Sequence, residues 1–226
     1  MILKMHMRLL PLLLLLVGCP SAEAVVDTTA VGELCSGLWS SEGRSLYLGD
    51  DLVPTRVLAP NKMIAIQATR DALFVTSKAG QISGVDMLIN PSLMEVLWSP
   101  DSRRFAFNVS DGGIVGSWLT GAYSLSESGG VNKIIIENEI TKLANALPQC
   151  EEQEDANIGI VSWLAGGEEL LLVAEVPPHS SCRNMGALQG FRVSVATGKI
   201  IEQISEKSLR LQWRVALGCR FSGSSE

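Results

Sequence analysis

The residues best suited to chemistry in this chain are His179 and the two serines that follow it, Ser180 and Ser181. Once the first 24 residues are set aside as a leader, His179 is the one histidine left. A Ser-His-acid site also needs a strained, exposed turn under the serine and an orienting acid, and the chain has no G-x-S-x-G motif. A single histidine also excludes a zinc centre built from several histidines. We therefore interpret His179, Ser180, Arg183 and Asn184 as candidate binding-loop residues and assign no catalytic residue.

Carboxylates are the remaining route to catalysis. Glycoside hydrolysis needs two facing carboxyl groups about 5 to 10 Å apart. Acidic side chains are plentiful in the chain, and the candidates are Asp101, Asp111, Glu168, Glu169 and Glu175. The sequence does not place any two of them across a cleft. It contains no G-x-G-x-x-G motif and no P-loop, so we expect no nucleotide cofactor, and no ligand pattern predicts a metal.

The cysteines predict two disulfides. Cys19 lies in the leader and is removed or lipidated, which leaves Cys35, Cys150, Cys182 and Cys219. An even number in an oxidising compartment is typical of disulfide pairing. We expect Cys150 to pair with Cys182, because both flank the same strand pair, and Cys35 to pair with Cys219, which would tie the first strand to the last. Four buried free thiols are the alternative.

The N-terminus has the pattern of a signal peptide. Lys4 and Arg8 precede an apolar run from residue 9 to 17, and the segment ends Ala22-Glu23-Ala24. The run is too short to span a bilayer, which needs about 20 apolar residues. Cleavage after Ala24 would leave a soluble protein. The alternative is a bacterial lipobox at residues 16–19, in which Cys19 is lipidated and anchors the protein to a membrane.

Charge argues against nucleic acid as a partner. The whole chain has a net charge of −6, and removing residues 1–24 takes away two basic side chains and one acidic one. An acidic protein repels phosphate backbones. We expect an exported protein of the bacterial periplasm or cell envelope, or a secreted one.

Strand and turn signals dominate the rest of the chain. Short apolar strands are expected at residues 46–48, 63–68, 73–76, 81–88, 95–98, 104–109, 117–125, 158–163, 170–176, 191–196, 200–204 and 209–217. Residues 138–147 have helical spacing and Pro148 follows them, which predicts a short amphipathic helix. Residues 177–186 form the longest irregular segment, and binding residues concentrate on such loops.

A strand ending in Trp, a polar turn and a second strand recur along the chain. The unit occurs at residues 96–107 and 161–173, a Trp-less version at 57–66 and a fragment at 211–213. Such recurrence indicates a repeat architecture. The residues from Trp98 to Phe107 read Trp-Ser-Pro-Asp-Ser-Arg-Arg-Phe-Ala-Phe, which resembles the TolB-like β-propeller repeat, Trp-Ser-Pro-Asp-Gly followed by a basic residue and an apolar strand.

The resemblance implies a blade in which the Trp packs between neighbouring sheets while Pro and Asp shape the turn. The match is partial at Trp163. The intervals from Trp98 to Trp163 and on to Trp213 are 65 and 50 residues, longer than the roughly 40 to 45 of a tryptophan-aspartate repeat blade. Insertions such as the expected helix would account for the excess.

The expected fold is all-β: an antiparallel, propeller-like array of about four to five blades with one short inserted helix, in a single domain over residues 25–226. An irregular β-sandwich is the alternative. The expected function is that of an exported, non-enzymatic scaffold that binds a protein or an envelope component. A carboxylate-dependent glycan hydrolase is the rival.

Overall fold

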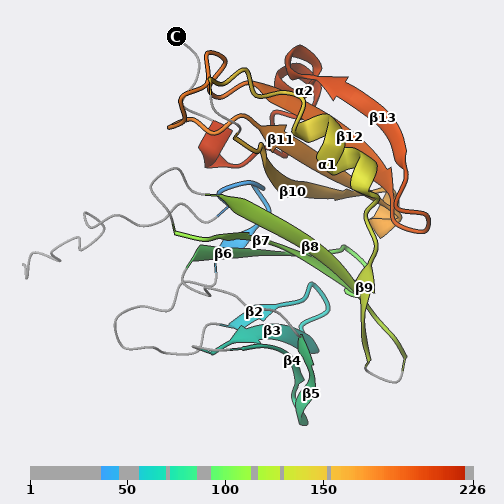
Figure 1. The fold of residues 1–226 in the computed structure, drawn as a ribbon. Coiled ribbons are helices and arrows are strands. Elements are labelled where there is room, and N and C mark those ends of the chain that lie inside the picture. Colours follow the sequence, from blue (N-terminus) through green and yellow to red (C-terminus); the bar gives the residue numbers. More distant parts are fainter. Residues whose placement is uncertain are drawn as a thin grey trace, which may run out of the picture. The chain divides into compact units, whose positions relative to one another are not determined.

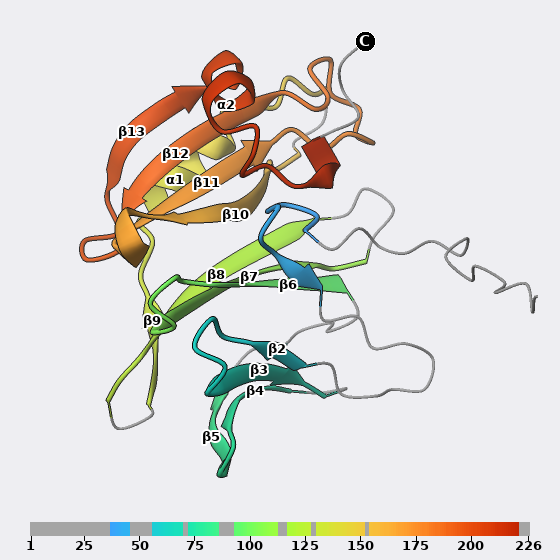
Figure 2. The same ribbon diagram turned by 180° about the vertical axis from the view of Figure 1, so that it is seen from behind.

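The computed structural model describes residues 37–45, 56–69, 72–85, 93–112, 117–127, 130–151 and 154–221. These residues belong to one compact unit, Leu34–Glu226, and form three antiparallel sheets and two α-helices (Figures 1 and 2). The expected leader, Cys19 and Cys35 lie outside the described residues. No helix in these ranges is long and apolar enough to cross a membrane.

Each sheet is built from strands that mostly follow one another in the sequence. The first sheet has the order β2-β3-β4-β5, from β2 (Arg56–Leu58), β3 (Ile64–Ala68), β4 (Leu73–Ser77) and β5 (Gly80–Val85). The middle sheet has the order β1-β6-β7-β8-β9, from β1 (Arg44–Ser45), β6 (Met94–Trp98), β7 (Arg104–Ser110), β8 (Trp118–Leu125) and β9 (Val131–Ile134). The third has the order β10-β11-β12-β13, from β10 (Asn157–Leu164), β11 (Glu169–Glu175), β12 (Leu188–Ser194) and β13 (Ile200–Ser205).

Apolar side chains of neighbouring sheets form shared cores. Val57, Ile66 and Val75 of the first sheet pack in one cluster with Phe105 and Phe107 of the middle sheet. A second cluster joins the middle sheet to the third and includes the buried residues of α1 (Asn138–Ala144). The expected helix at 138–147 is thus confirmed, with its apolar stripe on the sheet core. All-β architecture with antiparallel sheets is also confirmed, although the described part holds three sheets and none of them is closed.

The outer face of the third sheet is covered by α2 (Glu206–Gln212), which lies on the opposite face from α1 (Figures 1 and 2). The prediction of a strand at 209–217 is therefore wrong. Ser205 caps the helix by accepting a hydrogen bond from Ser208 N, and Glu206 forms an ion pair with Arg210 one turn later. Trp213 is the residue at the end of this helix, so it does not belong to a third repeat of the strand motif.

The recurring turn has the same geometry in the first two sheets. In Ala59-Pro60-Asn61-Lys62 and in Ser99-Pro100-Asp101-Ser102, the fourth residue has a positive φ, 58° at Lys62 and 60° at Ser102. The N–H of this fourth residue donates to the carbonyl of the first residue in each turn. The side chain of the third residue accepts from the N–H two positions later, that of Met63 in one turn and of Arg103 in the other. The Trp-less segment is therefore a structural equivalent of the Trp98 segment.

The two tryptophans of the motif make equivalent contacts with the preceding sheet. The Nε1 of Trp98 donates to the carbonyl of Val57 at 3.1 Å, and the Nε1 of Trp163 donates to the carbonyl of Leu97 at 3.3 Å. Both acceptors lie in the strand before the repeated turn, β2 in the first sheet and β6 in the middle sheet. The indoles therefore join consecutive sheets as well as filling the space between them.

The two ends of the described chain pair with each other. Residues 37–41 exchange backbone hydrogen bonds with residues 216–220. Trp39 lies fully buried in the cluster on the outer face of the third sheet. Its ring occupies the place where a side chain on Gly159 would project, which explains a glycine inside strand β10.

Candidate functional site

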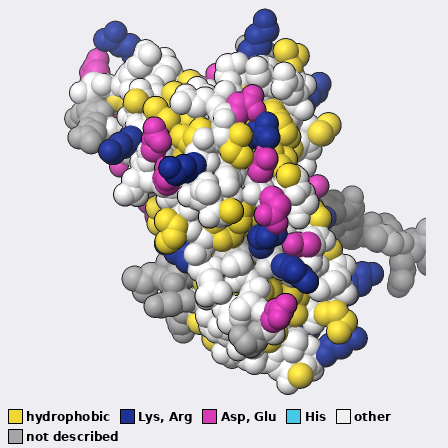
Figure 3. Space-filling view, turned by 90° about the vertical axis from the view of Figure 1, so that its right-hand side faces the viewer, with side chains coloured by type: hydrophobic (Ala, Val, Ile, Leu, Met, Phe, Trp, Pro, Cys, Tyr) yellow, Lys and Arg dark blue, Asp and Glu magenta, His cyan; other side chains and the backbone are white. Residues whose placement is uncertain are grey.

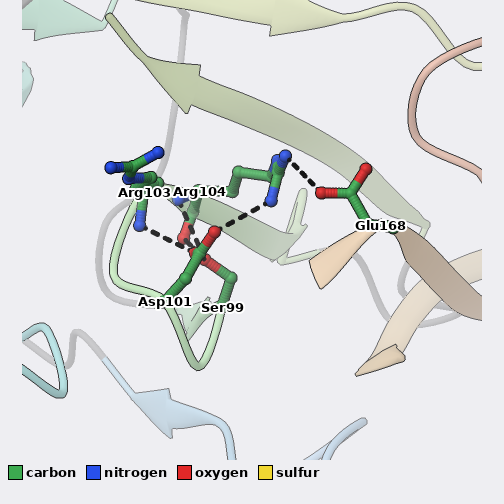
Figure 4. A network of polar contacts seen from close by, with 5 residues as sticks. All are labelled: Ser99, Asp101, Arg103, Arg104 and Glu168. Carbon is green, nitrogen blue, oxygen red and sulfur yellow. Dashed lines mark hydrogen bonds and ion pairs between the residues drawn. The ribbon is translucent and has the colours of Figure 1, made fainter. Parts of the chain in front are cut away.

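The turn between β6 and β7 carries a polar network that ties two sheets together (Figure 4). The Oγ of Ser99 lies 2.5 Å from Oδ1 of Asp101 and accepts a hydrogen bond from the N–H of Arg104 at 2.9 Å. The same Asp101 oxygen accepts from the N–H of Arg103 at 2.9 Å. These bonds hold Ser102 in its left-handed conformation. They also fix the backbone of Arg104 at the start of β7, and with it the direction in which the Arg104 side chain points.

Arg104 extends from this turn to the third sheet. Its Nη1 lies 3.0 Å from Oδ2 of Asp101, and its Nη2 lies 2.8 Å from Oε1 of Glu168. Glu168 follows the short turn η3 (Ala165–Gly167) between β10 and β11. Two of the five candidate carboxylates are therefore brought to one guanidinium, as Figure 4 shows.

This arrangement fits an ion bridge better than an acid-base pair. Partial burial raises the pKa of Asp101, but hydrogen bonds from Ser99 and Arg103, with the charges of Arg104 and Arg103, outweigh burial and leave the pKa below its ordinary value. A general acid for glycoside cleavage needs a raised pKa. The other candidates lie apart from this bridge: Asp111 accepts from Ser117 N, Glu169 pairs with Arg192, and Glu175 pairs with Arg220.

Two hollows flank the turn. One, of about 390 Å³, is lined by Arg104, Lys133 and the turn between β12 and β13. The other, of about 430 Å³, is lined by Arg103, Ser102 and residues of the first sheet. The side of the molecule that carries β9 and β13 shows basic and acidic side chains next to one another, with hydrophobic ones between them (Figure 3). Neither hollow is lined by a histidine or by two carboxylates.

The segment 177–186 is anchored tightly to the loop that follows α1. Cys182 forms a disulfide with Cys150, which confirms one of the two expected pairs. Asn184 accepts from Gln149 N at 2.9 Å and donates to the carbonyl of Leu147 at 2.8 Å. The Oγ and N–H of Ser181 both donate to Glu154. The segment is thus tied to its neighbour by covalent and hydrogen bonds together.

The four candidate loop residues fall into two kinds. The Oγ of Ser180 donates to the carbonyl of Pro177 at 2.6 Å, and Asn184 is used in the bonds just described, so both side chains shape the loop. His179 and Arg183 are exposed. Neither of these two side chains forms a hydrogen bond or ion pair with any residue the structure describes.

Cys219 is also disulfide-bonded. Its expected partner, Cys35, lies outside the described residues, so the Cys35 to Cys219 pair stays a prediction. The hydrogen bonds between residues 37–41 and 216–220 bring the two ends of the chain together, as that pair requires.

One buried acid, in the middle sheet, was not predicted from the sequence. Glu95, on β6, is 1% exposed, and its two carboxylate oxygens accept from the N–H groups of Trp39 at 2.9 Å and Ser40 at 3.0 Å. Burial raises its pKa to about 7, against the lowering effect of these bonds and of Asn108. A glutamate within the apolar run of β6 was the available signal, because an acid is rarely buried without a partner.

Asn108 connects this acid to the third sheet. Its Oδ1 accepts from the N–H of Ile160 at 2.7 Å, and its Nδ2 donates to the carbonyl of Ile160 at 2.8 Å and lies 3.5 Å from Glu95. Ile160 lies beside a register shift in the pairing of β10 with β11. The side-chain amide therefore takes the place that a backbone partner would occupy.

The sequence matches no protein-family model. No curated protein matches it either.

Glu95 makes stability depend on pH in a defined direction. Its folded pKa of about 7 exceeds the ordinary value of 4.5, so the folded state holds an extra proton between these values, and stability falls as pH rises through that window. We expect the free energy of unfolding of the wild type to fall by on the order of 3 kcal/mol between pH 4.5 and pH 8. The variant Glu95→Gln should not show this fall. Urea unfolding at both pH values measures it.

The matched control for this test is Glu139→Gln, which changes an exposed acid. It should leave the pH dependence of the wild type in place. An equally steep loss of stability in the Glu95→Gln variant would contradict the role given to Glu95.

Proposed function

We propose that this chain is a non-enzymatic, exported, β-propeller-like protein that binds another protein or an envelope component through the segment 177–186. The observation that carries the proposal is the contrast within this segment between a fixed backbone and exposed side chains. The disulfide and the bonds of Asn184 immobilise the backbone, while His179, Arg183 and Met185 face solvent.

Immobilisation matters because a binding loop that is already ordered loses little conformational entropy when it meets its partner. Arginine is among the residues that contribute most at protein interfaces, and methionine is enriched there. Met185 is 52% exposed, so its side chain is accessible to a partner. The segment therefore has the composition and the rigidity of a recognition surface.

The propeller-like part of the proposal draws support from the repeated units. Consecutive sheets share a turn geometry, and each motif tryptophan bonds the preceding sheet, a relation expected between blades of a TolB-like propeller. The disulfide is compatible with an oxidising compartment. We propose export on this ground together with the signal-like N-terminus, through either cleavage after Ala24 or lipidation of Cys19.

Photo-crosslinking tests the proposal, with a photoreactive amino acid incorporated at position 183 of the exported protein. We expect one discrete cross-linked partner, and the double variant Arg183→Glu with Met185→Ala should weaken its binding by about tenfold or more. Lys199→Glu, an exposed change in another turn, is the control and should leave binding intact. Loss of binding in the control alone, or no cross-link at position 183, would overturn the proposal.

The glycan hydrolase is the weaker candidate, because Asp101 and Glu168 share Arg104 and the pKa of Asp101 lies below its ordinary value. Release of reducing sugar from envelope glycans that disappears in both Asp101→Asn and Glu168→Gln would favour it over a binding role. A protein that binds its partner and releases no sugar would exclude it.

A further inference from the structure

The last turn of α2 and the turn that follows it expose apolar side chains to solvent. Leu211 is 72% exposed and Val215 is 86% exposed. Leu209 is the buried residue of this helix and fixes its inner side on the third sheet. Because residues two apart point to nearly opposite sides of a helix, Leu211 is directed outward by the same packing that buries Leu209.

Two exposed basic residues lie within four positions of these apolar residues in the sequence. Lys207 lies one turn before Leu211 on the outer side of α2 and is exposed, as is Arg214. The acid of the helix, Glu206, is neutralised by Arg210 at 2.8 Å. In a chain of net charge −6, this tip, formed by Lys207, Leu211, Arg214 and Val215, is locally positive.

We propose that the α2 tip docks on an anionic lipid surface, with Leu211 and Val215 entering the interface and Lys207 and Arg214 contacting lipid phosphates. Apolar residues flanked by Lys and Arg at the end of a surface helix match the composition of interfacial membrane segments. The two apolar side chains protrude, and neither of the hollows described above is lined by them. A bilayer accepts protruding side chains without a complementary pocket, whereas a folded protein partner needs one.

Vesicle co-sedimentation of the purified protein tests this docking. We expect binding to vesicles of equal parts phosphatidylglycerol and phosphatidylcholine, and little binding to phosphatidylcholine alone. The variant Leu211→Ser with Val215→Ser should weaken binding by about tenfold or more, and Lys207→Glu with Arg214→Glu should do the same and reduce the salt dependence.

The matched control is Leu119→Ser with Ile135→Ser. These residues are 69% and 72% exposed and lie outside α2, so the change removes as much exposed apolar surface and should leave vesicle binding unchanged. All variants should keep the unfolding temperature of the wild type, because the side chains are exposed.

Three outcomes would overturn the proposal: no sedimentation with the anionic vesicles, equal binding of the Leu211→Ser with Val215→Ser variant, or capture by immobilised polyglutamate in place of the vesicles. The last would mark the tip as a site for an acidic polypeptide. Because the segment 177–186 is untouched by these variants, partner cross-linking at position 183 distinguishes failure of this proposal from failure of the proposed function.

Discussion

Replacing Trp163 with alanine should lower the free energy of unfolding by about 3 to 5 kcal/mol. The indole is 6% exposed within the cluster that joins the middle sheet to the third, and its Nε1 donates to the carbonyl of Leu97. Alanine would leave a cavity and remove the hydrogen bond to the Leu97 carbonyl. Equilibrium unfolding in urea, followed by circular dichroism, measures the change.

Two further tryptophan variants sharpen this result. Trp163→Phe keeps the ring and removes the hydrogen bond, so it should cost about 1 to 2 kcal/mol. Trp213→Ala should cost less than Trp163→Ala, because Trp213 ends α2 and is only partly buried. A loss below about 1 kcal/mol for Trp163→Ala, or equal losses at positions 163 and 213, would contradict a joining role for Trp163.

The double variant Cys150→Ser with Cys182→Ser should be about 3 to 4 kcal/mol less stable than the wild type. The bond joins residues 32 apart in the sequence, and a loop of that length loses this much freedom in the unfolded chain when it is closed. Removing the bond also frees one anchor of the segment 177–186. Urea unfolding gives the loss in stability, and limited proteolysis reports cleavage within the segment.

The control for this variant is Ser180→Ala, which removes the hydrogen bonds that the Ser180 hydroxyl forms with Pro177 and Cys182 and leaves the disulfide in place. It should cost about 1 kcal/mol and leave the segment resistant to protease. If the double variant were as stable and as resistant as the wild type, the hydrogen bonds of Asn184 alone would account for the order of this loop.

Local patterns predicted most of the sheets. Alternating and continuous apolar runs marked strands such as Ile64–Ala68 and Glu169–Glu175, and helical spacing with a following proline marked α1. The Cys150 to Cys182 bond was predictable because both residues flank neighbouring strands. The strand and helix patterns depend on residues close in sequence, which is why the sequence alone was sufficient for them.

The prediction failed at residues 209–217 for a physical reason. Leu209, Leu211, Trp213 and Val215 alternate with polar residues, the pattern of a strand with one buried face. The cap at Ser205 and the ion pair of Glu206 with Arg210 favour a helix instead. When a sequence with alternating apolar residues forms a helix, these residues cannot all lie on its buried side.

The candidate site was predicted only in part. The motif turn was visible in the sequence, but the ion bridge from Arg104 to Glu168 joins residues 64 apart, and nothing local specifies that distance. The buried Glu95 depends on Trp39 and Ser40, which are more than 50 residues away. Contacts of this kind arise from packing of whole sheets, so they become visible only in the folded chain.

The pairing of residues 37–41 with residues 216–220 bears on when this protein can finish folding. The first of these segments leaves the ribosome well before its partner, and synthesis of the intervening stretch takes roughly 10 to 40 s at 5 to 20 residues per second. Until the third sheet has been made, Trp39 lacks most of the side chains that bury it. The pairing of residues 37–41 then requires residues 216–220, so a chain that stops short of residue 216 would expose this unpaired segment to proteases and chaperones.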